Sequence, residues 1–323
     1  ELRCVLWLTF LFPLCLGKSS DLVIDEIDDF TGDDLIAIGR LIHLAGMLGR
    51  KVMISSATIP PALAIGYFNA YKKGWQVFSN SRDEAKAEIG CAWIDEFRTD
   101  VHTIKVINTE SALPQYQQHH DSFIDKRVTK LKQQIAKRKA EIIACPLLKQ
   151  QSLDESDSCE KEYFLTIEQA ILTKHQQHHS IDSKTQIKVS FGVVRIANIT
   201  PCVALTKHLL QADFHDDSSV ESTEVRVMAY HSQQVLLLRH EQEKHLDGVL
   251  KRKEKKGQEQ QAFSDPIIRQ HLDKSGSKNI IFILVATPVE EVGRDHDFDW
   301  AIVEPSSYRS IVQLAGRVRR HRT

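Results

Sequence analysis

The chain has 323 residues, a length that accommodates about two domains, and its 42% hydrophobic and 26% charged residues are ordinary for a soluble globular protein. The formal net charge of −1 excludes a basic field over the whole surface, so any nucleic-acid contact must come from local basic patches. The six cysteines are scattered without a Cys-x-x-Cys pair. This pattern argues against a zinc site or a disulfide framework and predicts a cytoplasmic protein.

The chain begins with Glu1, and we expect it to be part of a longer or processed protein. Residues Cys4–Leu16 are apolar, but the run is too short to span a bilayer and is interrupted by Pro13. A signal peptide is the weaker alternative, because the run lacks a basic flank beyond Arg3 and a small-x-small cleavage site. We therefore expect a buried strand or helix and no membrane association.

The tripeptide Gly17-Lys18-Ser19 invites assignment as a phosphate-binding loop. The full pattern requires a glycine where Phe12 stands, and it requires a helix to follow, whereas an apolar strand begins within three residues. The sequence therefore excludes this phosphate-binding loop from the chain.

A short apolar run, Leu22–Ile24, ends in an acidic cluster. The run suits a strand buried on both faces of a parallel sheet, and ligands bind at the C-terminal ends of such strands. Four carboxylates lie within Asp25–Asp29. A phosphate-bound Mg²⁺ would relieve their repulsion, with Asp25 as the metal ligand and Glu26 orienting the attacking water. The alternative is an acidic turn that caps the next helix through Asp29, Thr31 or Asp33.

Helical spacing over Leu35–Leu48, closed by Gly49, is followed by a strand over Lys51–Thr58. Together with Leu22–Ile24 this predicts a βαβ unit whose ligand-facing edge carries Ser56 and Thr58, although either could simply cap a helix. Beyond it the pattern predicts a helix and then three strands: Leu63–Tyr71, Trp75–Phe78, Ile89–Ile94 and Val101–Ile107.

Residues 108–184 are rich in Gln and His and predict a connector with helices over Asp121–Ala140 and Tyr163–Lys174 and an acidic loop over Leu153–Lys161. The His120-Asp121 doublet resembles a metal-binding pair, but a solvated turn is the favoured interpretation.

The last part of the chain alternates strands with helices, which predicts a second parallel sheet covered by helices on both faces. The expected strands are Gln186–Ala197, Glu224–Ala229, Asn279–Val285 and Asp299–Val303. The expected helices are 202–211, 234–250 and Ser307–Arg317. The basic tract Lys251–Lys256 is expected to be a solvated helix end.

The chain closes with an arginine-rich tail. On a helix, Gln313, Arg317 and Arg320 would share one face. Arginines grouped in this way without local carboxylates suit an outside anion such as a triphosphate, whose oxygens guanidinium groups bind bidentately. A basic patch that faces nucleic acid or solvent is the alternative.

Four motifs stand in order at these strand ends: Asp25-Glu-Ile-Asp28, Ser56-Ala-Thr58, Ala286-Thr-Pro with Glu291-Val-Gly-Arg-Asp295, and Gln313-x-x-Gly-Arg317-x-x-Arg320. Together they resemble motifs II, III, V and VI of superfamily 2 helicases. The amino-acid sequence of residues 299–322 is similar to that of the helicase–nuclease of type I CRISPR interference, most like subtype I-F.

The resemblance implies an α/β fold of tandem RecA-like lobes with parallel sheets, the first lobe only partial, joined by a helical connector. The expected boundaries are 1–112 for the C-terminal part of the first lobe, 113–184 for the connector or insertion and 185–323 for the second lobe.

Carried over to the matching positions, the resemblance implies an ATP- and Mg²⁺-dependent motor. Asp25 and Glu26 would serve Mg²⁺ and the attacking water, and Arg317 and Arg320 would be arginine fingers. The residues expected in the cofactor-binding cleft are Asp28, which also couples the lobes, Glu291, Gly293, Asp295 and Gln313. Ser56 and Thr58 would couple hydrolysis to DNA movement, and the expected DNA contacts are Asn198, Thr200 and Thr287.

The implied partners are single-stranded DNA and the guide-RNA surveillance complex that recruits such enzymes to its displaced strand. The family's phosphate loop and nuclease domain, and the fused adaptation subunit of subtype I-F, would lie outside this chain. We therefore expect the chain to be inactive in ATP hydrolysis by itself. Two alternatives stay open: the motor of a repair or restriction helicase, and a catalytically silent module that binds nucleic acid or partner proteins.

Overall fold

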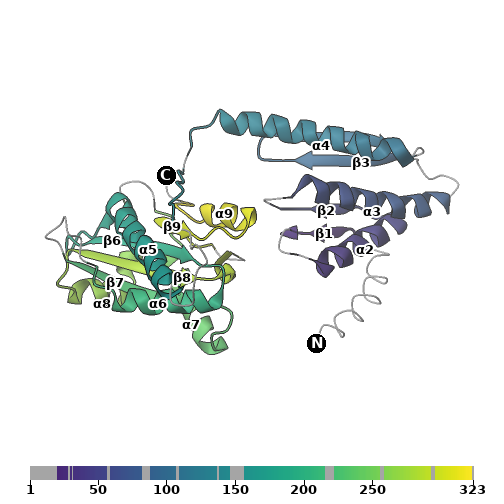
Figure 1. Cartoon of the computed structure of the whole chain (residues 1–323). Coiled ribbons are helices and arrows are strands. Elements are labelled where there is room, and N and C mark those ends of the chain that lie inside the picture. Colours follow the sequence, from purple (N-terminus) through teal and green to yellow (C-terminus); the bar gives the residue numbers. More distant parts are fainter. Residues whose placement is uncertain are drawn as a thin grey trace. The chain divides into compact units, whose positions relative to one another are not determined.

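The structure is a computed structural model (Figure 1). It describes residues 20–27, 30, 32–56, 59–81, 88–106, 109–136, 138–145, 156–214, 222–254, 258–291 and 295–321. The chain forms two compact units, residues 1–137 and 138–323. The expected connector is thereby shared between the two units, and the boundaries at 112 and 184 stay predictions. Within the described ranges no helix has the length and apolar character needed to cross a membrane.

The first unit opens with the predicted βαβ arrangement. Strand β1 (Leu22–Ile24) pairs in parallel with β2 (Val52–Ile54). The connecting helix α2 (Asp33–Met47) and the following helix α3 (Pro61–Asn80) pack on this strand pair through a cluster that includes Ile27, Ile38, Ile42 and Tyr67. After α2 the chain turns at Gly49, whose φ of 66° lies in the left-handed region that glycine favours.

The strand predicted over Trp75–Phe78 is wrong, because these residues continue α3. The aromatic rings of Tyr71 and Trp75 stack with centroids 6.2 Å apart, and those of Trp75 and Phe78 lie 5.1 Å apart. A spacing of four and then three residues is helical, so the period of the preceding helix simply extends. Helix α2 crosses α3 closely, since a Cβ on Gly74 would lie 2.0 Å from the carbonyl oxygen of His43.

An antiparallel hairpin and a long helix complete the first unit. The predicted strands are confirmed as β3 (Glu88–Ile94) and β4 (Thr99–Lys105), and α4 (Thr109–Lys132) packs on the hairpin. Helix α4 begins and ends earlier than the predicted Asp121–Ala140. The solvated turn expected at His120 is wrong, because His120 is buried within α4 and accepts a hydrogen bond from Trp93 Nε1 at 3.3 Å.

The second unit contains the predicted second parallel sheet. Strands β6 (Lys188–Arg195), β7 (Thr223–Tyr230), β8 (Asn279–Ala286) and β9 (Trp300–Val303) run parallel in the order β7-β8-β6-β9. A short strand, β5 (Ser180–Ile181), pairs antiparallel with the start of β6. Because β6 pairs with both β8 and β9, its residues are buried on both faces.

Helices cover both faces of this sheet, as predicted (Figure 1). One face packs against α5 (Ser156–His178) and α6 (Ile199–Gln211). The other packs against α7 (Leu236–Leu250), α8 (Pro266–Lys274) and α9 (Tyr308–Ala315). Two short helices, η3 (Gln261–Ser264) and η4 (Pro288–Glu291), pack on this same face. Helix α5 starts inside the expected acidic loop Leu153–Lys161, so that loop is shorter than predicted.

Strand β6 carries a glycine where the sheet has no room for a side chain. A Cβ on Gly192 would lie 2.1 Å from the Trp300 ring, and Trp300 is itself buried. The indole therefore rests directly on the β6 backbone. Its Nε1 donates to Ser190 Oγ at 3.1 Å, which fixes the ring in this position.

Gly192→Ala should lower the free energy of unfolding by about 1–3 kcal/mol, the usual cost of overpacking, because the new methyl group collides with the Trp300 ring. Gly248→Ala on α7 is the matched control. A Cβ there meets no atom within 4 Å, and we expect a gain of about 0.5–1 kcal/mol. Urea unfolding of the two variants measures both changes in the free energy of unfolding. Equal changes in the two variants would contradict the packing argument.

A buried histidine joins α5 to the same strand. His175 Nδ1 lies 2.7 Å from Ser190 Oγ, and its Nε2 lies 3.3 Å from Asn279 Oδ1. Burial lowers the pKa of His175 to about 4, with the Asn279 hydrogen bond acting in the opposite direction. The imidazole is therefore neutral in the folded protein throughout the physiological range.

The second unit should lose stability as the pH falls from about 6.5 to 4. The unfolded chain binds a proton at His175 below pH 6.5, whereas the folded chain resists it down to about pH 4. The loss attributable to His175 is up to about 3 kcal/mol. Urea unfolding across this range should show a weaker pH dependence for His175→Gln than for the exposed control His240→Gln. If the free energy of unfolding had the same pH dependence in both variants, His175 would not be the cause of the loss of stability.

Candidate functional site: the carboxyl edges of the two sheets

The acidic strand end of the first unit lies on its surface. Asp25 and Glu26 are exposed directly after β1, and Glu26 adopts a left-handed φ of 51°. The parallel register, with Ile24 opposite Ile54, brings the end of β2 and the half-buried Ser56 to the same edge. The predicted site residues Asp28 and Thr58 lie outside the described residues.

An exposed carboxylate at this edge fits Mg²⁺ chemistry. Mg²⁺ usually keeps several waters and takes one or two carboxylates together with phosphate oxygens, so it does not require a cage of protein ligands. Asp25 could supply such a carboxylate. Among the described residues no group of three or more His, Cys, Asp or Glu side chains forms a preassembled metal site.

At the carboxyl edge of the second sheet a buried arginine connects three segments. Arg195, the last residue of β6, is 2% exposed. Its Nε donates to Glu291 Oε1 at 2.7 Å, its Nη2 to Ser310 Oγ at 3.1 Å and its Nη1 to the carbonyl oxygen of Glu304 at 3.1 Å. One guanidinium thus holds η4, the start of α9 and the end of β9 to the sheet. Sequence patterns did not single out Arg195 because it lies within an apolar strand.

Glu291 has no carboxylate oxygen left unbonded. Its Oε1 accepts from Arg195, and its Oε2 accepts from Ser310 Oγ at 3.0 Å. The residue is 8% exposed. Ser310 in turn is held by Ser307, which caps α9 by accepting from the Ser310 amide. Glu291 therefore lies at the predicted edge, but both of its carboxylate oxygens accept hydrogen bonds from protein side chains, Arg195 and Ser310.

The shared helical face predicted for Gln313, Arg317 and Arg320 is wrong. Helix α9 ends at Ala315, and the chain then leaves the helix beside Phe298: the Phe298 amide donates to the Arg317 carbonyl, and the Arg319 amide donates to the Phe298 carbonyl, each at 2.9 Å. Backbone pairing with the segment before β9 competes successfully with continuation of the helix. Arg319 completes the turn with a φ of 46°.

The two predicted arginine fingers have different environments, and both have carboxylates nearby, contrary to expectation. Arg317 is buried and its Nη2 donates to the carbonyl oxygen of Glu291 at 2.5 Å. Burial lowers the pKa of Arg317, an effect opposed by the charge of Glu290. Arg320 is exposed and its Nε lies 3.2 Å from Asp295 Oδ1. The His321 hydrogen bond, aided by Arg320, holds the pKa of Asp295 below its usual range.

The remaining predicted residues are distributed along the same edge. Thr287 is buried just beyond β8, and its amide donates to the Tyr230 carbonyl at 3.1 Å. Asn198 and Thr200 are exposed at the start of α6, and Gln313 is half-buried on α9. Gly293 lies outside the described residues.

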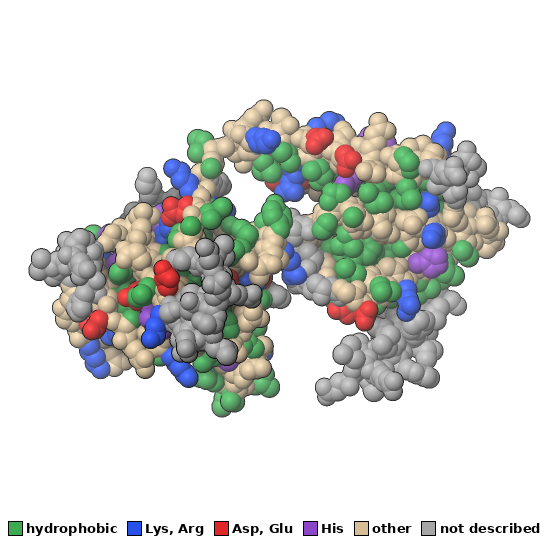
Figure 2. All heavy atoms as spheres, in the orientation of Figure 1, with side chains coloured by type: hydrophobic (Ala, Val, Ile, Leu, Met, Phe, Trp, Pro, Cys, Tyr) green, Lys and Arg blue, Asp and Glu red, His purple; other side chains and the backbone are tan. Residues whose placement is uncertain are grey.

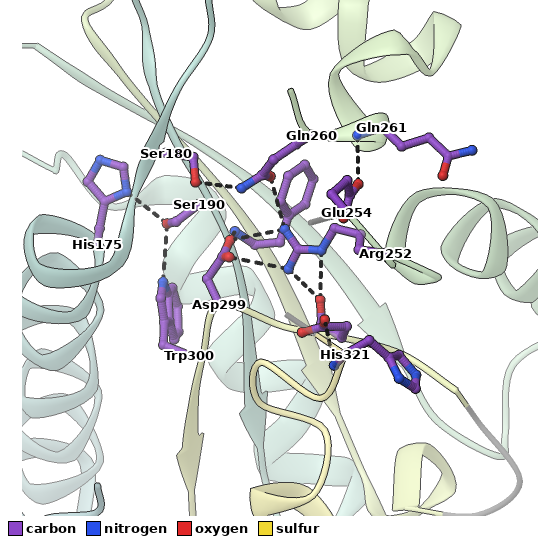
Figure 3. Close-up of polar contacts among 12 residues, drawn as sticks. His175, Ser180, Ser190, Arg252, Glu254, Gln260, Gln261, Asp299, Trp300 and His321 are labelled. Carbon is purple, nitrogen blue, oxygen red and sulfur yellow. Dashed lines mark hydrogen bonds and ion pairs between the residues drawn. The ribbon is translucent and has the colours of Figure 1, made fainter. Parts of the chain in front are cut away.

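A second buried arginine lies beside the segment that precedes β9 (Figure 3). Arg252 is fully buried. Its Nη1 and Nη2 lie 3.4 and 3.3 Å from the two Asp299 carboxylate oxygens, and its Nε donates to the Asp297 carbonyl at 2.9 Å. The guanidinium carbon lies 5.0 Å from the centroid of the Phe191 ring. The Asp297 carboxylate accepts from the His321 amide at 3.3 Å, so this cluster also holds the end of the arginine-rich tail.

The solvated helix end predicted for Lys251–Lys256 is thus wrong at Arg252. The tract follows α7, and Lys251 and Lys253 are exposed as expected. Only the partner Asp299, which lies 47 positions away along the chain, distinguishes Arg252 from its neighbours. Local sequence carries no indication of that pairing.

The fold and these strand ends define the class of protein. A structure of T. fusca Cas3 with ATP matches 94% of this chain and 27% of that chain, with a TM-score of 0.50 and 17% sequence identity. The fold is α/β with parallel sheets and is similar to RecA-like helicase lobes, as predicted.

Sequence comparison identifies the particular relatives. Residues 188–323 match the family model for the CRISPR-associated nuclease/helicase Cas3, C-terminal. The chain is 38% identical over 313 residues to the CRISPR-associated nuclease/helicase Cas3 subtype I-F/YPEST of Pseudomonas aeruginosa. It is 38% identical over 318 residues to the protein of the same name from Pectobacterium atrosepticum. Each match covers 96% of this chain and 27% of the relative. The predicted resemblance to the Cas3 helicases of subtype I-F is confirmed, and the chain spans about a quarter of the length of these curated relatives.

Arg252→Ala should lower the free energy of unfolding by about 3–5 kcal/mol, because it leaves the buried Asp299 carboxylate without its cation. Lys251→Ala is the matched control from the same basic tract. Lys251 is 49% exposed and pairs with Asp247 one helical turn away, so its loss should cost at most about 1 kcal/mol. Urea unfolding of both variants tests the assignment, and a cost below about 1 kcal/mol for Arg252→Ala would refute it.

Proposed function

We propose that this chain is part of an ATP-dependent helicase that moves single-stranded DNA and feeds it to a nuclease in CRISPR antiviral defence. The observation that carries the proposal is 38% identity to Cas3 proteins of subtype I-F over nearly the whole chain. The motor itself would include a phosphate loop and a nuclease domain that this chain does not contain. We therefore propose that residues 1–323 alone do not hydrolyse ATP.

In this proposal ATP binds with Mg²⁺, which would neutralise phosphate charge when bound. Asp25 serves the ion and Glu26 orients the attacking water. Arg320 is the arginine best able to reach a triphosphate, because it is exposed and has only the half-exposed Asp295 as a neighbouring carboxylate in the described contacts. Arg317 contributes from its buried position after α9, and Gln313 from within α9.

We propose that DNA contacts are made mostly to phosphate and are therefore insensitive to base sequence. The proposed contacts are Asn198 and Thr200, which are exposed, and Thr287, which is buried just beyond β8. On the face shown in Figure 2 acidic and basic side chains are interspersed, and no broad basic surface is seen there. The guide-RNA surveillance complex is the proposed partner that delivers the DNA.

The test is ATP hydrolysis by the full-length natural protein that carries this segment, with and without single-stranded DNA. We expect DNA-stimulated turnover, and we expect Arg320→Ala to lower it by about 10³-fold, as for other arginine fingers. Lys274→Ala, an exposed cation at the end of α8, is the control and should retain full turnover. Absence of hydrolysis in the unmodified protein would instead favour a silent binding module.

A further inference from the structure

Three side chains at the carboxyl edge of the second sheet form a closed set of hydrogen bonds. Arg195 donates to Glu291 and Ser310, and Ser310 donates to Glu291. Each member comes from a different segment, β6, η4 and α9, and all three are less than 10% exposed. The set is therefore a buried joint between segments, in which each side chain is bonded to the other two.

The joint is connected to the arginine-rich tail in two ways. The main-chain carbonyl of Glu291 accepts from Arg317 Nη2 at 2.5 Å, so whatever fixes Glu291 also fixes this guanidinium. Ser310 lies in α9, from whose end Arg317 and Arg320 follow within five residues of Ala315. A shift of the joint would therefore move both arginines.

We infer that Arg195, Glu291 and Ser310 are positioning residues, which set the placement of Arg317 and Arg320 without contacting nucleotide. The inference rests on the proposed function for its effect on ATP hydrolysis. It assigns to the Glu291 carboxylate a hydrogen-bonding task inside the protein in place of direct cofactor binding. It also assigns roles to Arg195 and Ser310, neither of which belongs to the four sequence motifs.

The decisive comparison is Glu291→Gln against Glu291→Ala in the full-length natural protein. The glutamine oxygen can still accept from Arg195, and its amide can donate to the Ser310 hydroxyl, so the joint survives without the negative charge. We expect Glu291→Ala to lower kcat by about 10²-fold, the cost of a misplaced catalytic group, with a smaller change in KM. Glu291→Gln should stay within a few-fold of the unmodified protein.

A double-variant cycle separates positioning from independent contributions. Arg195→Ala with Glu291→Ala should be little worse than either single variant, because each alone opens the same joint. The inference is overturned if Glu291→Gln is as damaging to kcat as Glu291→Ala, or if the two losses are additive.

Ser310→Ala provides a milder variant should the larger changes prevent folding. It removes one hydroxyl, and we expect a several-fold loss in kcat. Ser277→Ala is its matched control, because Ser277 also donates to a carboxylate, Glu224 Oε1 at 3.1 Å, near the opposite ends of the strands. Equal turnover in both serine variants would count against the inference.

Hydrogen exchange in the 323-residue chain gives a readout that needs no ATP hydrolysis. Ser310→Ala and Glu291→Ala should accelerate exchange of the Arg319 amide, which donates to Phe298, and leave the β7 amides unchanged. Unchanged exchange at Arg319 would overturn the inference. If the unmodified full-length protein lacked ATPase activity, the proposed function would fail while this measurement still tested the joint.

Discussion

The buried ion pair between Arg195 and Glu291 is the interaction on which the architecture of the second unit's edge depends. Removing two charges from water is costly, and the cost is recovered only when the remaining hydrogen-bonding groups are also satisfied. Here Ser310 and the Glu304 carbonyl provide those partners. These groups come from separate segments. Hydrogen bonding of both charged side chains therefore requires η4, the end of β9 and the start of α9 to lie next to one another.

Strand β6 is where several such constraints coincide. Its Phe191 amide donates to Asp299 at 2.8 Å, its Gly192 lies under the Trp300 ring, and it ends in Arg195. Arg252 then neutralises the same Asp299 from the other side. The polar groups of this strand are thus bonded to partners in α5, η4 and α9 and at the start of β9, which is the condition for burying them at modest cost.

This rigid edge suits the proposed role as half of a nucleotide-responsive motor. Arginine groups that stabilise developing charge act best when their positions are set before the reaction. Arg317 is fixed by main-chain and burial constraints, whereas Arg320 is exposed and held by Asp295. One site would therefore combine a fixed cation with one that can exchange its partner.

Much of the fold was predicted from residue patterns. The wrong predictions share one cause, which is that they depend on residues outside the local pattern. Continuous apolar runs located β6 and β8, because strands buried on both faces leave that pattern. The runs of β1 and β2 also located strands, but the expected burial on both faces is wrong there, since Val23 and Met53 are exposed. The aromatic run at Trp75–Phe78 suggested a strand since its helical spacing becomes visible only together with Tyr71. The buried positions of His120 and Arg252 depend on Trp93 and Asp299, which are remote in sequence.

The sequence by itself determined the α/β alternation, the order of the motifs and which strand ends carry charge, because these are local properties of composition and period. Tertiary structure decided which of these charges are buried and which are exposed. It buried Arg317 and Glu291, left Asp25, Glu26 and Arg320 exposed, and ended α9 at Ala315 in favour of pairing with Phe298. The physical reason is that burial, ion pairing and backbone pairing all require a second segment, whose approach no local pattern specifies.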